Sequence, residues 1–138
     1  MPTNVFDHAT QTADLWIRDM MRELGTDDAR VAYHALGASL HALRDRLSVD
    51  EAAQLSAQLP LLVRGLFFEG WHPASTPVHV RRPEDLLALV DQRAGDGHRV
   101  DAERAVAATF EVLRRHVSAG QLASLAHVLP PSLAELVR

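Results

Sequence analysis

Residues 43–71 read LRDRLSVDEAAQLSAQLPLLVRGLFFEGW, and they carry the clearest boundary signals in the chain. Ser48 and Glu51 form a capping box, in which each side chain accepts a hydrogen bond from the other residue's backbone amide. Pro60 interrupts the short helix that follows, because proline lacks an amide hydrogen and disfavours helical geometry in the residue before it. Proline suits the first turn of a new helix, so another helix is predicted over about 60–69.

The inner face of this last helix is predicted from its spacing of apolar residues. The residues assigned to that face are Leu62, Val63, Leu66 and Phe67. Gly70 is expected to end the helix, since glycine is the usual residue just beyond a helix C-terminus.

Two longer helices are predicted before this stretch. Apolar residues recur at helical spacing over 16–24, which predicts a first helix that begins at Thr10 or Thr12. Residues 1–9 carry little pattern and are interpreted as a loosely held arm. The longest helix is predicted over about 28–47.

One face of the longest helix carries large apolar residues at steps of three and four: Tyr33, Leu36, Leu40, Leu43 and Leu47. A flank of small residues lies beside them: Ala32, Ala35, Ala38, Ser39 and Ala42. Thr26 and Asp27 are expected to cap the helix, with Asp28 near its positive end. Gly37 costs about 1 kcal/mol relative to alanine within a helix, so we expect a neighbouring helix to pack closely there.

The second half of the chain repeats the first. A shift of 70 residues aligns 29–68 with 99–138 without a gap, and eleven of these forty positions are identical. Chance would give about two or three identities, and internal repeats of this kind indicate a repeated helical unit. The sequence therefore predicts an all-α protein of two tandem pseudo-repeats of about four helices each. They cover about 10–71 and 83–138, joined by the proline-rich linker 72–82 and packed into a single bundle-like domain.

Composition excludes several kinds of chemistry. The chain has no cysteine, which rules out disulfides and thiolate sites. All 14 basic residues are arginines, so Schiff-base catalysis by lysine and a P-loop lysine are ruled out as well. The net charge of −4 opposes nucleic-acid binding. With no secretory signal and no membrane-spanning run, we expect a cytoplasmic protein that does not associate with membranes.

The stretch ALRDRLSVDEAAQLSAQLPLLVRGLFFEGW, residues 42–71, resembles the bacterial family DUF2267, a domain of unknown function. The resemblance rests on LRDRL, the serine-capped acidic helix start, AQLP and RGLFFEGW, and it extends over essentially the whole chain. It implies a bacterial, cytoplasmic, all-helical protein with two related halves, and it implies no activity. The second half departs from the pattern, because Glu135 replaces Gly65 and no FFEGW equivalent follows.

Residues 67–71 are the part of the opening stretch without a copy, and the candidate interaction surface is centred on them. This surface comprises Arg64, Phe67, Phe68, Glu69 and Trp71. These aromatic residues could pack between the halves, or they could form a surface that binds a protein partner or a second copy, since aromatic residues dominate interface hot spots. The flanking arginine and glutamate could steer a partner or simply form an ion pair.

The polar residues give no catalytic constellation. His34, His41 and Asp45 lie roughly on one helical face, but no metal-binding motif occurs, and surface histidines are the simpler interpretation. Gly95-Asp96-Gly97 is interpreted as a turn between helices. We therefore expect a non-enzymatic protein-interaction or regulatory module without a cofactor or metal, which could self-associate. The alternative is a helical domain that binds a small ligand or metal in the groove between the repeats.

Overall fold

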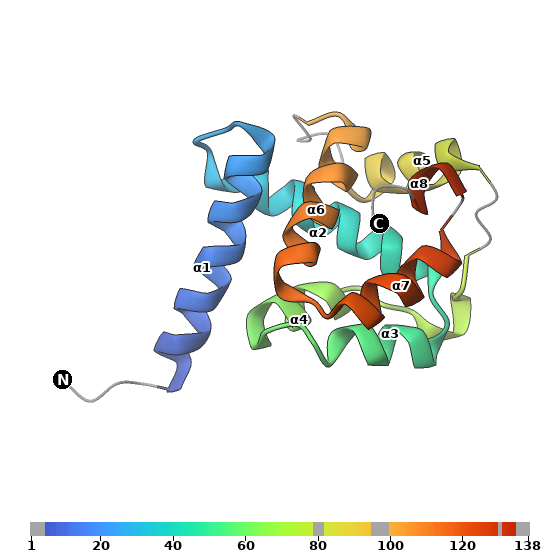
Figure 1. Ribbon diagram of the computed structural model, residues 1–138, viewed down its shortest axis with the longest axis horizontal. Coiled ribbons are helices and arrows are strands. Elements are labelled where there is room, and N and C mark those ends of the chain that lie inside the picture. Colours follow the sequence, from blue (N-terminus) through green and yellow to red (C-terminus); the bar gives the residue numbers. More distant parts are fainter. Residues whose placement is uncertain (1–4, 79–81, 95–99, 130, 135–138) are drawn as a thin grey trace.

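The computed structural model describes residues 5–78, 82–94, 100–129 and 131–134 (Figure 1). In chain order their helices are α1 (Val5–Leu24), α2 (Ala29–Arg46), α3 (Val49–Ser56), α4 (Leu61–Phe68), the short 3-10 helix η1 (Pro73–Ser75), α5 (Pro83–Ala94), α6 (Ala102–His116), α7 (Ala119–Val128) and α8 (Pro131–Ala134). Helices are the only regular secondary structure in these residues, which confirms the all-α prediction.

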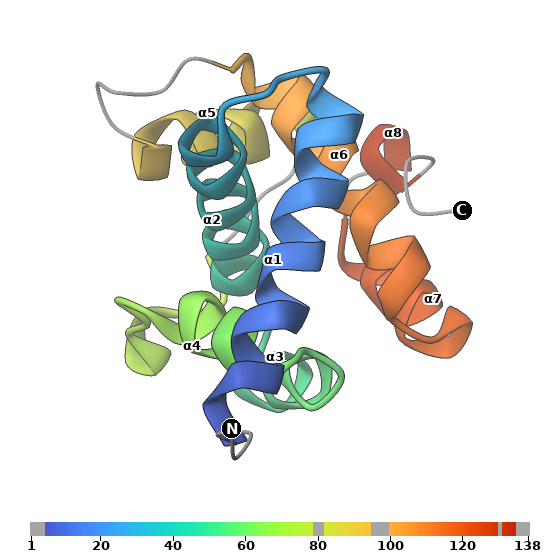
Figure 2. The ribbon, with the colours of Figure 1, turned by 90° about the vertical axis from the view of Figure 1, so that its left-hand side faces the viewer.

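Helix α2 lies at the centre of the molecule. It packs against α1, α4, α5 and α6, and Figures 1 and 2 show these helices arranged around it. The leucine face and the flank of small residues are buried as predicted, because neighbouring helices cover α2 on several sides. The exception is Tyr33, which is 44% exposed because it lies near the start of α2, where two cavities open.

The close approach predicted at Gly37 is confirmed. A Cβ atom at this position would lie 3.4 Å from Cδ1 of Leu66, so α4 crosses α2 where α2 has no side chain. The two helices are therefore held at short range, and Leu66 sits on the floor of the candidate site described below.

The caps are largely those read from the sequence. Ser48 and Glu51 form the complete capping box of α3, with distances of 3.1 Å and 2.8 Å between backbone amide and side-chain oxygen. The cap of α2 differs from the prediction, since Asp28 itself accepts from the amide of Arg30 at 2.9 Å. Thr26 instead accepts from the amide of Asp28, one step outside the helix.

Two predicted boundaries or faces are wrong. Helix α1 begins at Val5 rather than at residue 10 or 12, because the helix continues outward from Ala9, its first buried residue, with exposed side chains that show no apolar period. Within α4, Val63 and Phe67 are buried as predicted, but Leu62 is 47% exposed. Leu62 lines an open groove. Its helical spacing correctly places it on an apolar face of α4, but no helix among the described residues covers that part of the face.

Helices of the second half also begin with side-chain caps. Asp101 caps α6 through the amide of Glu103, and Ser118 caps α7 through the amide of Gln121. The Gln58 side chain reaches across from the first half, accepting from the Ser118 amide at 2.7 Å and donating to its hydroxyl at 3.1 Å. The equivalence of the two halves as repeats stays a prediction. The turn predicted at 95–97 lies outside the described residues.

The predicted linker holds the short helix η1, and the Val78 amide donates to the carbonyl of Asp45 at 2.6 Å. Across the described residues, none of the helices has the length and apolar character needed to cross a membrane.

Candidate functional site

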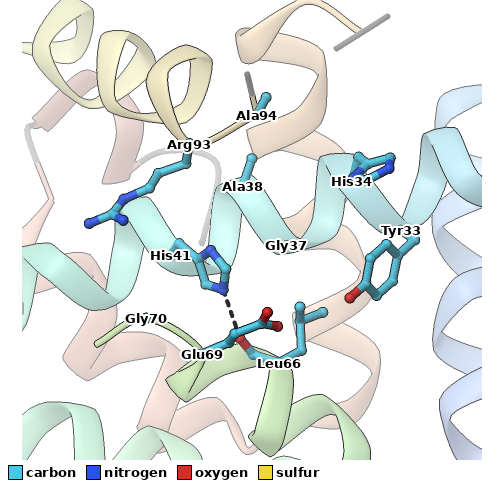
Figure 3. Close-up of a pocket in the computed structure, with 10 residues that line it drawn as sticks. All are labelled: Tyr33, His34, Gly37, Ala38, His41, Leu66, Glu69, Gly70, Arg93 and Ala94. Carbon is cyan, nitrogen blue, oxygen red and sulfur yellow. Dashed lines mark hydrogen bonds between the residues drawn. The ribbon is translucent and has the colours of Figure 1, made fainter. Parts of the chain in front are cut away.

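A cavity of about 410 Å³ with both polar and apolar lining, which we call the polar cavity, lies between α2, the end of α4 and the end of α5 (Figure 3). Its lining residues are Tyr33, His34, Gly37, Ala38, His41, Leu66, Glu69, Gly70, Arg93 and Ala94. Helix α5 belongs to the second half of the chain, so this cavity lies between the halves. Side chains of several chemical kinds line it, which is the usual composition of a ligand site.

His41 is fixed at the inner wall of this cavity. Its Nε2 atom lies 2.7 Å from the carbonyl oxygen of Leu66, so this nitrogen carries the hydrogen and donates it. Burial lowers the pKa of His41 below its ordinary value of 6.5, and the charges of Arg44 and Arg93 lower it further, against opposing effects of the Leu66 hydrogen bond and Glu69. The ring is therefore neutral at neutral pH, and its Nδ1 atom keeps a lone pair.

A buried charge network supports the cavity from behind. The Arg44 side chain is fully buried and donates from Nε to Oδ1 of Asp45 at 2.9 Å. Its Nη1 atom donates to the carbonyls of Phe67 at 2.9 Å and Glu69 at 2.7 Å. Arg93 of α5 pairs with the other oxygen of Asp45. These bonds satisfy carbonyls at the end of α4, which lack partners within the helix, and they hold Glu69 in place.

A second, mainly apolar groove of about 440 Å³ lies between α1, α2 and α4. Its lining residues are Ala13, Ile17, Tyr33, Leu36, Leu62, Val63, Gly65, Leu66 and Glu69. Tyr33, Leu66 and Glu69 line both the groove and the polar cavity, so the two adjoin along these side chains. We call the combined feature the α2 groove: an apolar part over α1 and α4, and a polar part toward α5.

Gly65 is an unexpected residue in the wall of the α2 groove. Its φ is not positive, and a Cβ atom built there would meet nothing within 4 Å. Glycine within a helix costs about 1 kcal/mol relative to alanine. Neither backbone conformation nor packing inside the chain therefore accounts for it, whereas its absent side chain widens the groove.

The aromatic residues predicted as a surface are largely packed inside. Phe67 is completely buried, so it does not contribute to a surface. Phe68 and Trp71 are half-buried against the core, with the Phe68 ring centroid 5.1 Å from that of Phe67 and 4.9 Å from that of Trp71. The Arg44 bonds to the α4 carbonyls turn this end of the chain inward, which the sequence spacing did not reveal.

The two charged residues of the predicted surface have separate roles. Arg64 donates from Nε to the carbonyl of Ser56 and from Nη2 to that of Leu59, both at 2.9 Å, and so completes the end of α3. Glu69 lines both parts of the α2 groove. Of the five residues in the predicted surface, Glu69 is the one that the structure places in the candidate site.

The histidine face is also divided. His34 and His41 both line the polar cavity, but Asp45 is buried beneath it in the ion pair with Arg44. Within the described ranges no three His, Cys, Asp or Glu side chains come close enough to hold a metal ion. Sequence reasoning missed Arg93 and the exposure of Tyr33. The tyrosine in a leucine stripe was the available signal, since its hydroxyl favours a position near solvent.

Comparison with protein families supports the resemblance stated above. The model of DUF2267, described as an uncharacterized conserved protein, matches residues 13–136. No curated protein matches the chain at a significant level.

Proposed function

We propose a function from the geometry of the molecule, because this chain belongs to the DUF2267 family of uncharacterized conserved proteins. The proposal is a non-enzymatic binding module that docks an amphipathic helix of a protein partner in the α2 groove. The observation that carries it is the apolar part of the groove, about 440 Å³ between α1, α2 and α4.

The exposed apolar residues of the groove support this proposal. Leu62 is 47% exposed and Tyr33 is 44% exposed, and they face a depression rather than standing alone on a convex surface. Such a depression between helices receives the apolar face of a further helix in a recurring mode of peptide recognition. Exposed tyrosine supplies a rigid contact of the kind that is enriched at interfaces.

The wall at Gly65 favours a helix as the occupant. Two helices approach to about 8–10 Å between their axes, and the distance depends on the side chains at the contact. An absent side chain in the wall permits the closer approach. Glycine at position 65 lowers the stability of α4, and no contact inside the chain offsets this loss. The space that the missing side chain leaves for the partner helix would explain why glycine is present.

The non-enzymatic character is supported by how the polar groups are used. Arg93 and Asp45 pair with each other, and the Nε2–H of His41 is committed to the carbonyl of Leu66. No general base with an adjacent nucleophile is evident in the described part of the cavity. In this proposal the polar groups hold the helices around the groove in position and take no part in a reaction.

A displayed library of amphipathic helices, selected on the full chain, tests the docking proposal. Affinities of the selected peptides are measured by fluorescence anisotropy against wild type and Leu62→Asp. Leu15→Asp is the matched control, because Leu15 is 53% exposed on α1 and does not line the groove. We expect Leu62→Asp to weaken binding at least about tenfold and Leu15→Asp to leave it unchanged.

Two results would contradict this function. The first is a selection that yields no binder, or only binders that are equally sensitive to both substitutions. The second is a dimer of the protein alone, seen by sedimentation and dissociated by Leu62→Asp, because the groove would then hold a second copy of the chain.

A second candidate function is favoured by the polar cavity. Its volume of about 410 Å³ and its mixture of polar and apolar lining residues suit a small polar ligand, held between the two halves. We propose thermal unfolding in the presence of a broad panel of metabolites and metal ions as the test. A rise in Tm that His41→Gln abolishes would support it, and no rise across the panel would count against it.

We also propose that the two halves are related repeats. The shared order of a long helix, a serine-capped short helix and a helix with proline at its N-terminal end supports this relation.

A further inference from the structure

This inference rests on the proposed function and specifies the chemistry of the partner. We propose that the docked helix carries a basic side chain, lysine or arginine, which it places against the carboxylate of Glu69 where the apolar and polar parts of the α2 groove meet. The position of Glu69, the pairing of its neighbours and the overall charge of the protein carry the proposal.

The backbone of Glu69 is anchored, but its carboxylate has no ion-pair partner among the described residues. Its backbone carbonyl accepts from the buried Arg44 at 2.7 Å, which fixes the residue at the end of α4. The residue is exposed and lines both parts of the groove. Among the described residues, no arginine or histidine forms a salt bridge with its carboxylate.

The arginines in and behind the cavity bind groups other than the Glu69 carboxylate. Arg44 is used by carbonyls and by Asp45, and Arg93 binds the second oxygen of the same aspartate. Figure 3 shows the guanidinium of Arg93 on the far side of His41, while the Glu69 carboxylate lies toward Tyr33. The Glu69 carboxylate therefore faces the open groove rather than the arginines.

His41 does not neutralise Glu69 either. Its lowered pKa keeps the ring uncharged at neutral pH. A carboxylate beside a neutral imidazole and an apolar groove is best complemented by a cation on an apolar stem. Lysine and arginine have this form, because their methylene chains pack on apolar surface while the charged end reaches a polar group.

Tyr33 and the protein's net charge favour the same chemistry. The exposed Tyr33 side chain lines the groove beside Glu69, and aromatic faces attract cations, most often arginine. The net charge of −4 attracts basic partners at long range. An acidic or neutral helix would leave the carboxylate facing apolar surface without compensation.

The experiment uses peptides obtained with the displayed library described above. Each charged position of a selected peptide is replaced in turn by Lys, Gln and Glu, and affinities are measured for wild type, Glu69→Gln and Glu69→Lys. Glu84→Lys, at an exposed residue of α5, is the control for the change of net charge. We expect one position at which Lys binds wild type about five- to tenfold more tightly than Glu.

The preference for Lys over Glu at that peptide position should vanish with Glu69→Gln and reverse with Glu69→Lys. The Glu84→Lys variant should show the same preference as wild type. Peptides that depend on Leu62 but show no such position, or that prefer Glu against wild type, would overturn this inference and leave the docking function intact. A library without any Leu62-dependent binder would overturn the docking function itself, so the two failures are distinguishable.

Discussion

The guanidinium of Arg44 lies 2.9 Å from the carbonyl oxygen of Phe67, and this hydrogen bond ties the end of α4 to the last turn of α2. The same guanidinium pairs with Asp45, whose other oxygen binds Arg93 of α5. Two adjacent buried side chains at the end of α2 therefore contact two further helices: Arg44 binds the end of α4, and Asp45 binds α5. Arg44 also anchors the backbone of Glu69 in the α2 groove.

Removing Arg44 should strongly destabilise the protein. Arg44→Met leaves Asp45 with one partner instead of two and leaves the carbonyls of Phe67 and Glu69 without their donor. Breaking a buried ion pair in this way costs about 3–5 kcal/mol. Urea unfolding at pH 7 measures the change in the free energy of unfolding.

The control for this prediction is Arg22→Met on α1. Arg22 is 71% exposed and lies 3.7 Å from Asp19, a surface ion pair that contributes at most about 1 kcal/mol. Equal losses of stability for both variants would show that the buried network contributes no more than a surface pair.

Gly65→Ala should stabilise the protein and weaken its proposed binding. A methyl group at residue 65 meets no atom within 4 Å, and alanine is about 1 kcal/mol better than glycine inside a helix. The same methyl group would narrow the α2 groove. We therefore expect a free energy of unfolding that rises by about 0.5–1 kcal/mol, together with lower affinity for selected peptides.

Gly70→Ala serves as the contrasting variant. Its φ is +74°, a conformation in which a Cβ atom is strained, so this substitution should lower stability by about 1 kcal/mol. A loss of stability of the same size in Gly65→Ala would contradict the prediction. It would mean that Gly65 is needed for the fold itself.

Acidification should destabilise the native state through His41. Its pKa is lowered in the folded protein, so below pH 6.5 the unfolded chain binds a proton that the folded chain does not. The free energy of unfolding should therefore fall as the pH decreases from 6.5 toward the lowered native value. Urea unfolding between pH 7.5 and about pH 5 measures this slope.

His41→Gln removes the titrating group and should reduce that slope, and His8→Gln, at an exposed position of α1, is the control for a histidine-to-glutamine change. The charged groups that act on His41 are Arg44, Arg93 and Glu69. A slope that is unchanged in His41→Gln would mean that other groups dominate the pH dependence.

Ser48→Ala should cost about 1 kcal/mol. The hydroxyl accepts from the Glu51 amide at 3.1 Å, and loss of a helix N-cap typically destabilises by that amount. Ser118→Ala should cost at least as much, because its hydroxyl also accepts from the Gln58 side chain. Ser75→Ala, at an exposed position of η1, is the control, and thermal unfolding ranks the variants.

Local signals were sufficient to predict most of the helices. The serine caps, Pro60 and the leucine spacing of α2 act within a few residues. They placed both ends of α2 and α4 and the start of α3 to within about two residues, while α3 ends at Ser56, before the predicted interruption at Pro60. The start of α1 was missed, because residues before Ala9 are helical without being buried. The periodic spacing of apolar residues indicates which part of a helix is buried. It therefore cannot locate the end of a helix that extends beyond the core.

The candidate site was predictable only in part. Glu69, His34 and His41 were singled out from the sequence, but the roles of Arg44 and Arg93 depend on contacts 23 and 48 residues away along the chain. No local sequence pattern predicts which distant carbonyl a buried arginine will bind. Leu62 has the spacing of a core residue, and only the arrangement of α1, α2 and α4 leaves it exposed.

The contact between Gln58 and Ser118 makes the folding of one half of the chain depend on the other half. A side chain of the first half serves as part of the cap of α7 in the second half, and Arg93 of the second half completes the pairing of Asp45 in the first. Each half thus supplies a component that the other lacks. Cutting the chain in the linker should yield two fragments that fold poorly when separate and regain helical structure when mixed.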